Sequence, residues 1–179
     1  MTSTKRFIRS QGDLDSACFL YSLVNAVQCL SGKKLLESAW QRLISCTYDP
    51  RDFLTSRTGT KRIDDHPHLI AELASRYIAT LEPRGKYRVD LLEGLDSTFV
   101  EKNPLKKQTL LVVDNGTHWF CMLDSSGGQI FVSCSAVWQN NPAKYTELSS
   151  PRLRRTYNDS FPASKLVFFQ QRALLVTAK

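Results

Sequence analysis

The chain lacks several features that define whole protein classes. Of its 179 residues only 8 are Gly and 7 are Pro, which excludes collagen-like and low-complexity chains, and 42% are hydrophobic, which excludes disorder. It has no apolar run of the roughly 18 to 20 residues that cross a bilayer, and its first ten residues lack the apolar stretch of a secretory signal. A single globular domain over residues 1–179, in the cytoplasm and without a membrane partner, is therefore expected.

Cysteine usage excludes two further classes. The five cysteines are odd in number and unevenly spaced, and no pair has the CxxC spacing of a metal site. We therefore expect neither a disulfide framework nor a metal, and no cofactor motif accompanies them. Free thiols fit a reducing compartment, where most of them pack as small hydrophobic side chains.

The chain has more basic than acidic residues. Its 24 Lys and Arg against 17 Asp and Glu give a net charge of +7, which raises nucleic acid as a partner. The basic residues are scattered, however, and no helix-turn-helix, zinc-finger or RRM signature accompanies them, so nucleic acid is disfavoured. A solvated basic surface is the simplest interpretation, and an acidic protein partner or substrate is the alternative.

Hydrophobic periodicity predicts helices in the first half and strands in the second. Apolar residues at three-to-four spacing indicate a helix that begins near Ala17 and stops at Gly32, with Asp15 or Ser16 as its N-cap. Further helices fit residues 35–46 and 67–81, and residues 48–63 resemble a loop. A short strand at 5–10 and strands at 109–113, 118–123, 129–133 and within 165–176 complete an α+β fold, while 82–107 gives no clear pattern.

One cysteine is placed as a nucleophile would be. Cys18 falls in the first turn of the first long helix, where free backbone N–H groups and the helix dipole lower a thiol's pKa. Gln11 stands seven residues upstream, from where its amide could bind a developing oxyanion beside the Cys18 N–H. His118 follows the turn DNGT and opens a strand, so it is the best candidate base, whereas His66 and His68 flank Pro67 at a helix start and favour a surface role.

A third member of the site would accept the far N–H of the imidazole. If the hairpin loop is centred within residues 124–128, the residue opposite His118 is Ser133, Cys134 or Ser135. None of these is Asp or Asn. Ser133 can accept a hydrogen bond but brings no charge, so the third position is weak, unless Asn115, Asp124, Asn140 or Asn141 replaces it.

The chain carries Gln11, Cys18 and His118 in that order. The sequence QGDLDSACFLYSLVNA opens a helix, and THWFCML is followed by QIFVSCS. This pattern resembles the papain-like cysteine peptidase superfamily, in particular small bacterial members. The resemblance implies a helical half packed on an antiparallel meander, with Cys18 as nucleophile, His118 as base and acid, and Gln11 as oxyanion donor. Ser133 stands where that pattern has Asp, and Phe19 puts a bulky ring where substrate would approach.

These features predict a hydrolase that cleaves an amide in a peptide or protein, and a bacterial effector, toxin or defence component is the analogy. Deamidation or transglutamination of a glutamine uses the same machinery. The rival hypothesis is a weakened papain-like domain that serves as a protein-interaction module.

Overall fold

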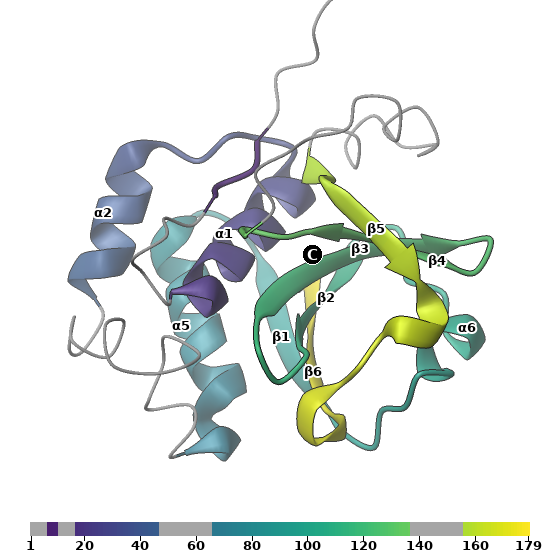
Figure 1. The fold of residues 1–179 in the computed structure, drawn as a ribbon. Helices are drawn as coiled ribbons and strands as arrows, with labels where there is room; N and C mark the ends of the chain where they lie inside the picture. The colour runs from purple at the N-terminus through teal and green to yellow at the C-terminus, as the bar shows by residue number, and fades with distance from the viewer. Residues whose placement is uncertain (1–6, 11–16, 47–65, 137–155) are drawn as a thin grey trace, which may run out of the picture.

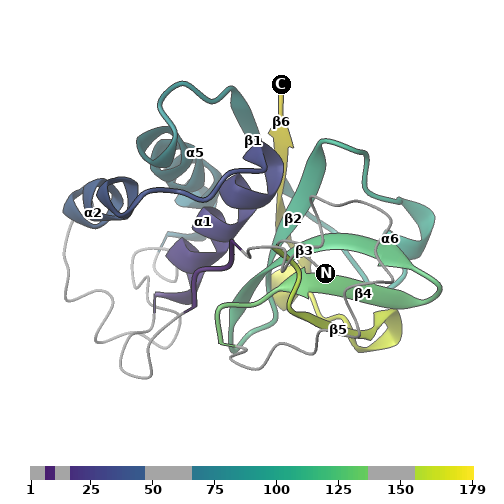
Figure 2. The same cartoon turned by 90° about the horizontal axis from the view of Figure 1, so that it is seen from above.

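The computed structural model describes residues 7–10, 17–46, 66–136 and 156–179. Three helices lie on one side of a sheet: α1 (Cys18–Ser31), α2 (Glu37–Ser45) and α5 (Ile70–Leu81), the last preceded by the 3-10 turn η1 (Pro67–Leu69) (Figure 1). A short helix, α6 (Phe99–Lys102), lies on the other side (Figure 2). The three larger helices correspond to those that the sequence predicts.

The sheet has six strands in the order β1-β6-β2-β3-β4-β5, and every neighbouring pair is antiparallel. Their bounds are β1 Tyr87–Leu92, β2 Thr109–Asp114, β3 Trp119–Ser126, β4 Gln129–Ser133, β5 Asp159–Pro162 and β6 Ala173–Ala178. The four strands β2 to β5 form a meander, and the C-terminal strand β6 lies between β1 and β2. The α+β fold with helices packed on an antiparallel sheet is thus confirmed.

Each face of the sheet carries its own apolar cluster. On the helical face, α1 and α5 pack against alternate residues of the central strands, among them Trp119, Cys121 and Leu174. On the opposite face, residues such as Phe120 and Met122 pack under α6 and the segment that follows β5. Alternation of buried side chains to the two faces explains why β2, β3 and β4 read as almost continuous apolar runs.

Helix α1 owes its bounds to its sequence. All residues from Cys18 to Leu30 are buried, so the helix runs through the core rather than along the surface. It ends where Gly32 adopts a left-handed conformation (φ 68°) and its N–H bonds to the Gln28 carbonyl, which is the expected role of a C-terminal glycine. Ala17 is the N-cap residue and supplies no side-chain cap. The predicted caps Asp15 and Ser16 lie outside the described residues.

Two strand predictions need correction, and two strands were missed. Residues 7–10 form no strand; Phe7 and Arg9 instead bond to side chains of α1. Strand β3 starts at Trp119 and continues to Ser126, because Gly127 and Gly128 (φ 57° and 72°) supply the two-residue turn, leaving DSS in the strand. Strands β1 and β5 were not predicted. The four residues of β5 carry no alternation, whereas β1 does alternate, with Tyr87, Val89 and Leu91 facing the helical cluster, so its signal was overlooked.

The predicted loop at 48–63 lies wholly outside the described residues. In the described part of the chain, no helix has the length and apolar character needed to cross a membrane.

Candidate active site

The start of α1 meets the start of β3. Cys18 is the first residue of the helix and is 3% exposed, and its thiol receives a hydrogen bond from the backbone N–H of Trp119. Trp119 directly follows His118, so the sulfur lies beside the residue next to the predicted base. Figure 1 shows the dark purple end of α1 close to the beginning of β3. Two parts of the chain a hundred residues apart are thereby brought together, as the sequence predicts.

An aromatic pair holds this junction. The rings of Phe19 and Trp119 pack edge to face, with their centroids 4.9 Å apart, and both side chains are buried. Such pairs contribute about 0.5–1.5 kcal/mol beyond the area that they bury. The Phe19 ring is fully buried in the core, and Cys18 beside it is only 3% exposed. Residue 19 lies roughly 100° around the helix from residue 18, which allows one side chain to face the core while the other faces β3.

The charge state of Cys18 differs from the sequence prediction. Burial raises the pKa of the thiol to about 11 from 9.0, and the Asp114 carboxylate adds to this increase. Three N–H groups act in the opposite direction: that of Trp119 on β3, and those of Phe19 and Cys18 itself, as expected for a helix start. Burial outweighs them. The predicted lowered pKa is therefore wrong, and the group is a neutral thiol at pH 7.

His118 is held by the turn that precedes it. The Asn115 side-chain oxygen accepts the backbone N–H groups of Thr117 (3.1 Å) and His118 (2.9 Å), and the Asn115 N–H donates to the His118 carbonyl (3.2 Å). The imidazole is half-buried, and burial lowers its pKa, so it is neutral at pH 7. Its Nε2 atom is buried and has no hydrogen-bond partner among the described residues.

Asp114 is a site residue that the sequence analysis missed. It is the last residue of β2 and pairs with Trp119, and it is 6% exposed. One carboxylate oxygen accepts the N–H of Gly116 at 2.8 Å, and the carboxylate charge acts on Cys18. We assigned Asp114 to the turn DNGT. A sequence signal for Asp114 does exist. It is a charged residue at the end of the apolar strand LLVV, four positions before His118.

Ser133 does not pair with His118. It lies opposite Cys121, where the pairing between β3 and β4 ends, and the register shifts by a bulge between Met122 and Asp124. The Ser133 hydroxyl is fully buried, and neither it nor the His118 Nε2 has a hydrogen-bond partner among the described residues. The predicted hairpin register is therefore wrong. The turn falls at Gly127 and Gly128, at the end of the predicted loop rather than at its centre, and this shifts the pairing away from His118; the bulge reverses only one residue of that shift.

The proposed replacements for the third member are engaged elsewhere or lie outside the described residues. The Asn115 side chain holds its own turn, and the Asp124 carboxylate accepts the N–H of Ser125 at 2.8 Å. Partial burial raises the pKa of Asp124. Asn140 and Asn141 fall outside the described part of the chain.

Gln11 also lies outside the described residues, but the segment before it is firmly placed. The Asn25 side chain bonds to both the N–H (2.8 Å) and the carbonyl (3.2 Å) of Arg9, and Gln28 donates to the Phe7 carbonyl. Phe7 therefore lies near the end of α1 and Arg9 nearer its middle. The segment runs toward the end of the helix that carries Cys18.

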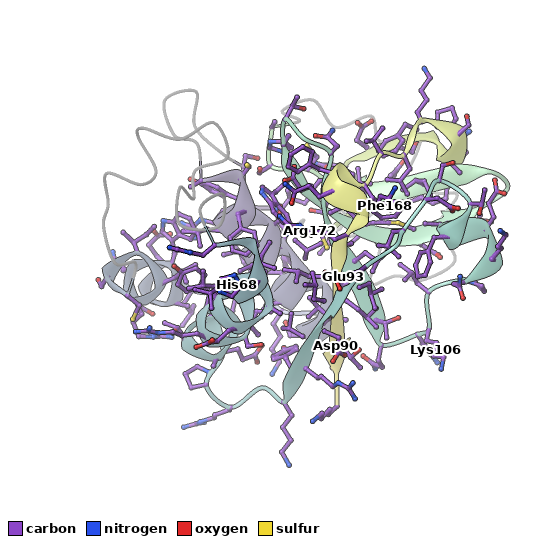
Figure 3. The ribbon with its side chains drawn as sticks, turned by 90° about the horizontal axis from the view of Figure 1, so that it is seen from below. His68, Asp90, Glu93, Lys106, Phe168 and Arg172 are labelled. Carbon is purple, nitrogen blue, oxygen red and sulfur yellow. The ribbon has the colours of Figure 1, made fainter. Side chains whose placement is uncertain are left out.

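The other thiols and imidazoles differ in their exposure. All five cysteines are free; Cys29 and Cys121 are buried, Cys134 is half-buried and Cys46 is exposed. His66 and His68 are exposed at η1, and Figure 3 shows His68 on the helical side. No group of three or more His, Cys, Asp or Glu within the described ranges could hold a metal ion.

Comparison of the chain with protein families, with curated proteins and with solved structures found no match in any of the three.

Proposed function

We propose that the chain is a cysteine hydrolase of papain-like architecture that cleaves an amide bond in a peptide or protein. The observation that supports the proposal is the junction itself: a thiol in the first turn of a core helix accepts the N–H of Trp119, one residue from the imidazole of His118. Nucleophilic catalysis by cysteine requires a thiol, a nearby base and N–H donors for the oxyanion. Five free cysteines fit a cytoplasmic location.

The charge states define how such a reaction begins. Both groups are neutral at pH 7, so the thiol must transfer its proton to His118 as the sulfur attacks the substrate carbonyl. The N–H of Trp119 stabilises the sulfur as it becomes negative. The carbonyl oxygen becomes an oxyanion, for which Gln11 and the backbone N–H of Cys18 are the donors.

The rest of the cycle follows from proton balance. The imidazolium of His118 protonates the leaving amine as the C–N bond breaks, which leaves an acyl group on the sulfur. Water then attacks the acyl carbon and gives its proton to His118, the C–S bond breaks, and the thiol regains its proton. If the leaving group is ammonia, the same steps deamidate a glutamine side chain.

A second candidate function is a protein-interaction module with little or no catalysis. The raised pKa of Cys18 favours it, as does the buried Nε2 of His118, which has no partner in the described part of the chain. An imidazole without an acceptor for its far nitrogen is held less firmly and is a poorer base.

A product assay separates the two functions. The full chain and its Cys18→Ala and His118→Ala variants are incubated with a proteome-derived peptide library, and new peptide termini and released ammonia are measured. Cys46→Ala is the matched control, because that thiol is exposed and lies beyond the end of α2. The hydrolase predicts products from the parent and the control only. Products that persist in Cys18→Ala, or no products from the parent, contradict it.

A further inference from the structure

A pocket of about 300 Å³ lies at the end of α1 that is remote from Cys18. It is bounded by the connection between α1 and α2, by α2, and by the end of α5 with the turn that follows. Its apolar lining comes from Leu35, Leu36, Ala39, Leu81 and Pro83. Leu36 is 73% exposed, the most exposed of the large hydrophobic side chains in the described residues. An aliphatic pocket with such an exposed leucine offers an anchor point for an apolar side chain of another molecule.

Four cations surround this pocket: Lys33, Lys34, Arg42 and Arg84. All are exposed, and none has an ion-pair partner among the residues that the structure describes. The lining contains one carboxylate, Glu82, which accepts a hydrogen bond from the Tyr87 hydroxyl at 2.7 Å. Four positive charges against one negative charge make a local field that attracts anions.

The pocket is separate from the candidate active site. Cys18 begins the 14-residue helix α1, and Lys33 comes two residues after its end. At 1.5 Å per residue the two ends are about 20 Å apart. Figure 2 shows the connection to α2 leaving α1 at the end opposite Cys18. A ligand in this pocket therefore need not touch the thiol, and its binding does not depend on the proposed hydrolase activity.

We infer that this basic pocket binds an acidic segment of a partner protein, with a bulky aliphatic side chain in the apolar lining and flanking Asp or Glu side chains on the cations. Charge complementarity selects an acidic ligand. The lining selects protein over nucleic acid, because it is aliphatic and none of its residues is aromatic, whereas single-stranded nucleic acids use aromatic side chains for base stacking. The positive charge of the whole chain is consistent with such a partner.

Three fluorescein-labelled peptides test this inference by fluorescence anisotropy: EDELLDEE, its apolar deletion EDESSDEE, and the charge reversal KRKLLRKK. The full chain is used, and the titration is repeated with Cys18→Ala so that a failure of the proposed catalysis cannot affect the result. We expect EDELLDEE to bind, EDESSDEE to bind about tenfold more weakly, and KRKLLRKK not to bind.

Matched variants locate the binding. Lys34→Glu with Arg42→Glu should weaken binding of EDELLDEE by about tenfold or more, and Leu36→Ser by about threefold or more. Lys106→Glu with Lys107→Glu is the control, because both lysines are exposed and Lys106 lies away from α2 and α5, which bound the pocket (Figure 3). We expect this control to change the affinity less than about twofold.

Four results would overturn the inference. The first is equal weakening by the Lys34→Glu/Arg42→Glu and Lys106→Glu/Lys107→Glu variants, which indicates a diffuse field. The second is equal binding of EDELLDEE and EDESSDEE. The others are displacement of EDELLDEE by a single-stranded oligonucleotide of higher affinity, and no binding of EDELLDEE up to 1 mM. A loss of binding in Leu36→Ser counts only when its melting temperature equals that of the parent chain.

Discussion

The reactivity of Cys18 toward iodoacetamide is set by the burial of its thiol. A pKa raised to about 11 from 9.0 lowers the thiolate fraction at neutral pH by about 100-fold, since each unit is a factor of ten. A more basic thiolate is also more nucleophilic, by about 6- to 10-fold over two units. Alkylation of the folded protein should therefore be at least about tenfold slower than alkylation of Cys18 in the urea-unfolded chain.

The pH dependence gives the sharper test. Because the pKa lies far above the working range, the rate constant should rise tenfold per unit from about pH 6.5 to 9.5 without a plateau. The assay is peptide-resolved mass spectrometry after timed alkylation, which follows each of the five cysteines separately. A plateau below pH 9, or faster labelling of the folded than of the unfolded chain, refutes the reasoning.

Replacement of Asp114 by Asn isolates one cause of the raised pKa. The amide oxygen can still accept the Gly116 N–H, but the negative charge beside the thiol is removed. Alkylation of Cys18 at pH 8 should become faster. Asp124→Asn is the matched control, because that carboxylate does not act on Cys18, and it should leave the rate unchanged. No acceleration in Asp114→Asn contradicts the proposed electrostatic role of that residue.

Three further predictions concern stability. Asn158→Ala should lower the free energy of unfolding by about 2–4 kcal/mol in denaturant titrations. The reason is that the Asn158 amide bonds to both the N–H (2.8 Å) and the carbonyl (2.6 Å) of Cys134. A loss below about 1 kcal/mol contradicts this prediction. Asn25→Ala removes two bonds to Arg9, so the Arg9 amide should exchange with solvent at least about tenfold faster by hydrogen-exchange mass spectrometry; unchanged exchange would show that other contacts hold the segment. Burial raises the pKa of Asp124, so its charged form destabilises the folded chain at pH values above the unfolded-state pKa. Asp124→Asn should therefore raise the melting temperature at pH 7, and this gain should shrink toward pH 4. A gain that does not depend on pH contradicts the burial of a charge.

The sequence predicts the two elements of the junction because they depend on local signals. The apolar period that starts at Cys18 and the glycine that ends the helix fix α1, and the turn before His118 fixes the start of β3. Helix α1 then packs on β3 because both are apolar. These short-range signals fix the two elements, whereas the expectation that their ends meet comes from the resemblance to papain-like peptidases.

The chemistry at the junction depends on tertiary packing, which the sequence does not show. A cysteine in a first helical turn gains N–H donors wherever the helix lies, but the depth of its burial is set by the packing of Phe19 against Trp119 and by the sheet behind them. The same limit applies to Ser133, since the turn at Gly127 and Gly128 lies later than the predicted loop centre and places Ser133 opposite Cys121. Strand β1, by contrast, carries a usable local signal, since Tyr87, Val89 and Leu91 alternate with Arg88 and Asp90.

The distance between the Cys18 sulfur and the nearer ring nitrogen of His118, in an experimental structure with a peptide-based inhibitor bound, tests the proposed catalytic pair most directly. The account predicts a separation within about 4 Å, with the inhibitor carbonyl oxygen near the backbone N–H of Cys18. An imidazole turned away from the sulfur in that complex, or an inhibitor bound elsewhere while Cys18 stays unmodified, would contradict it.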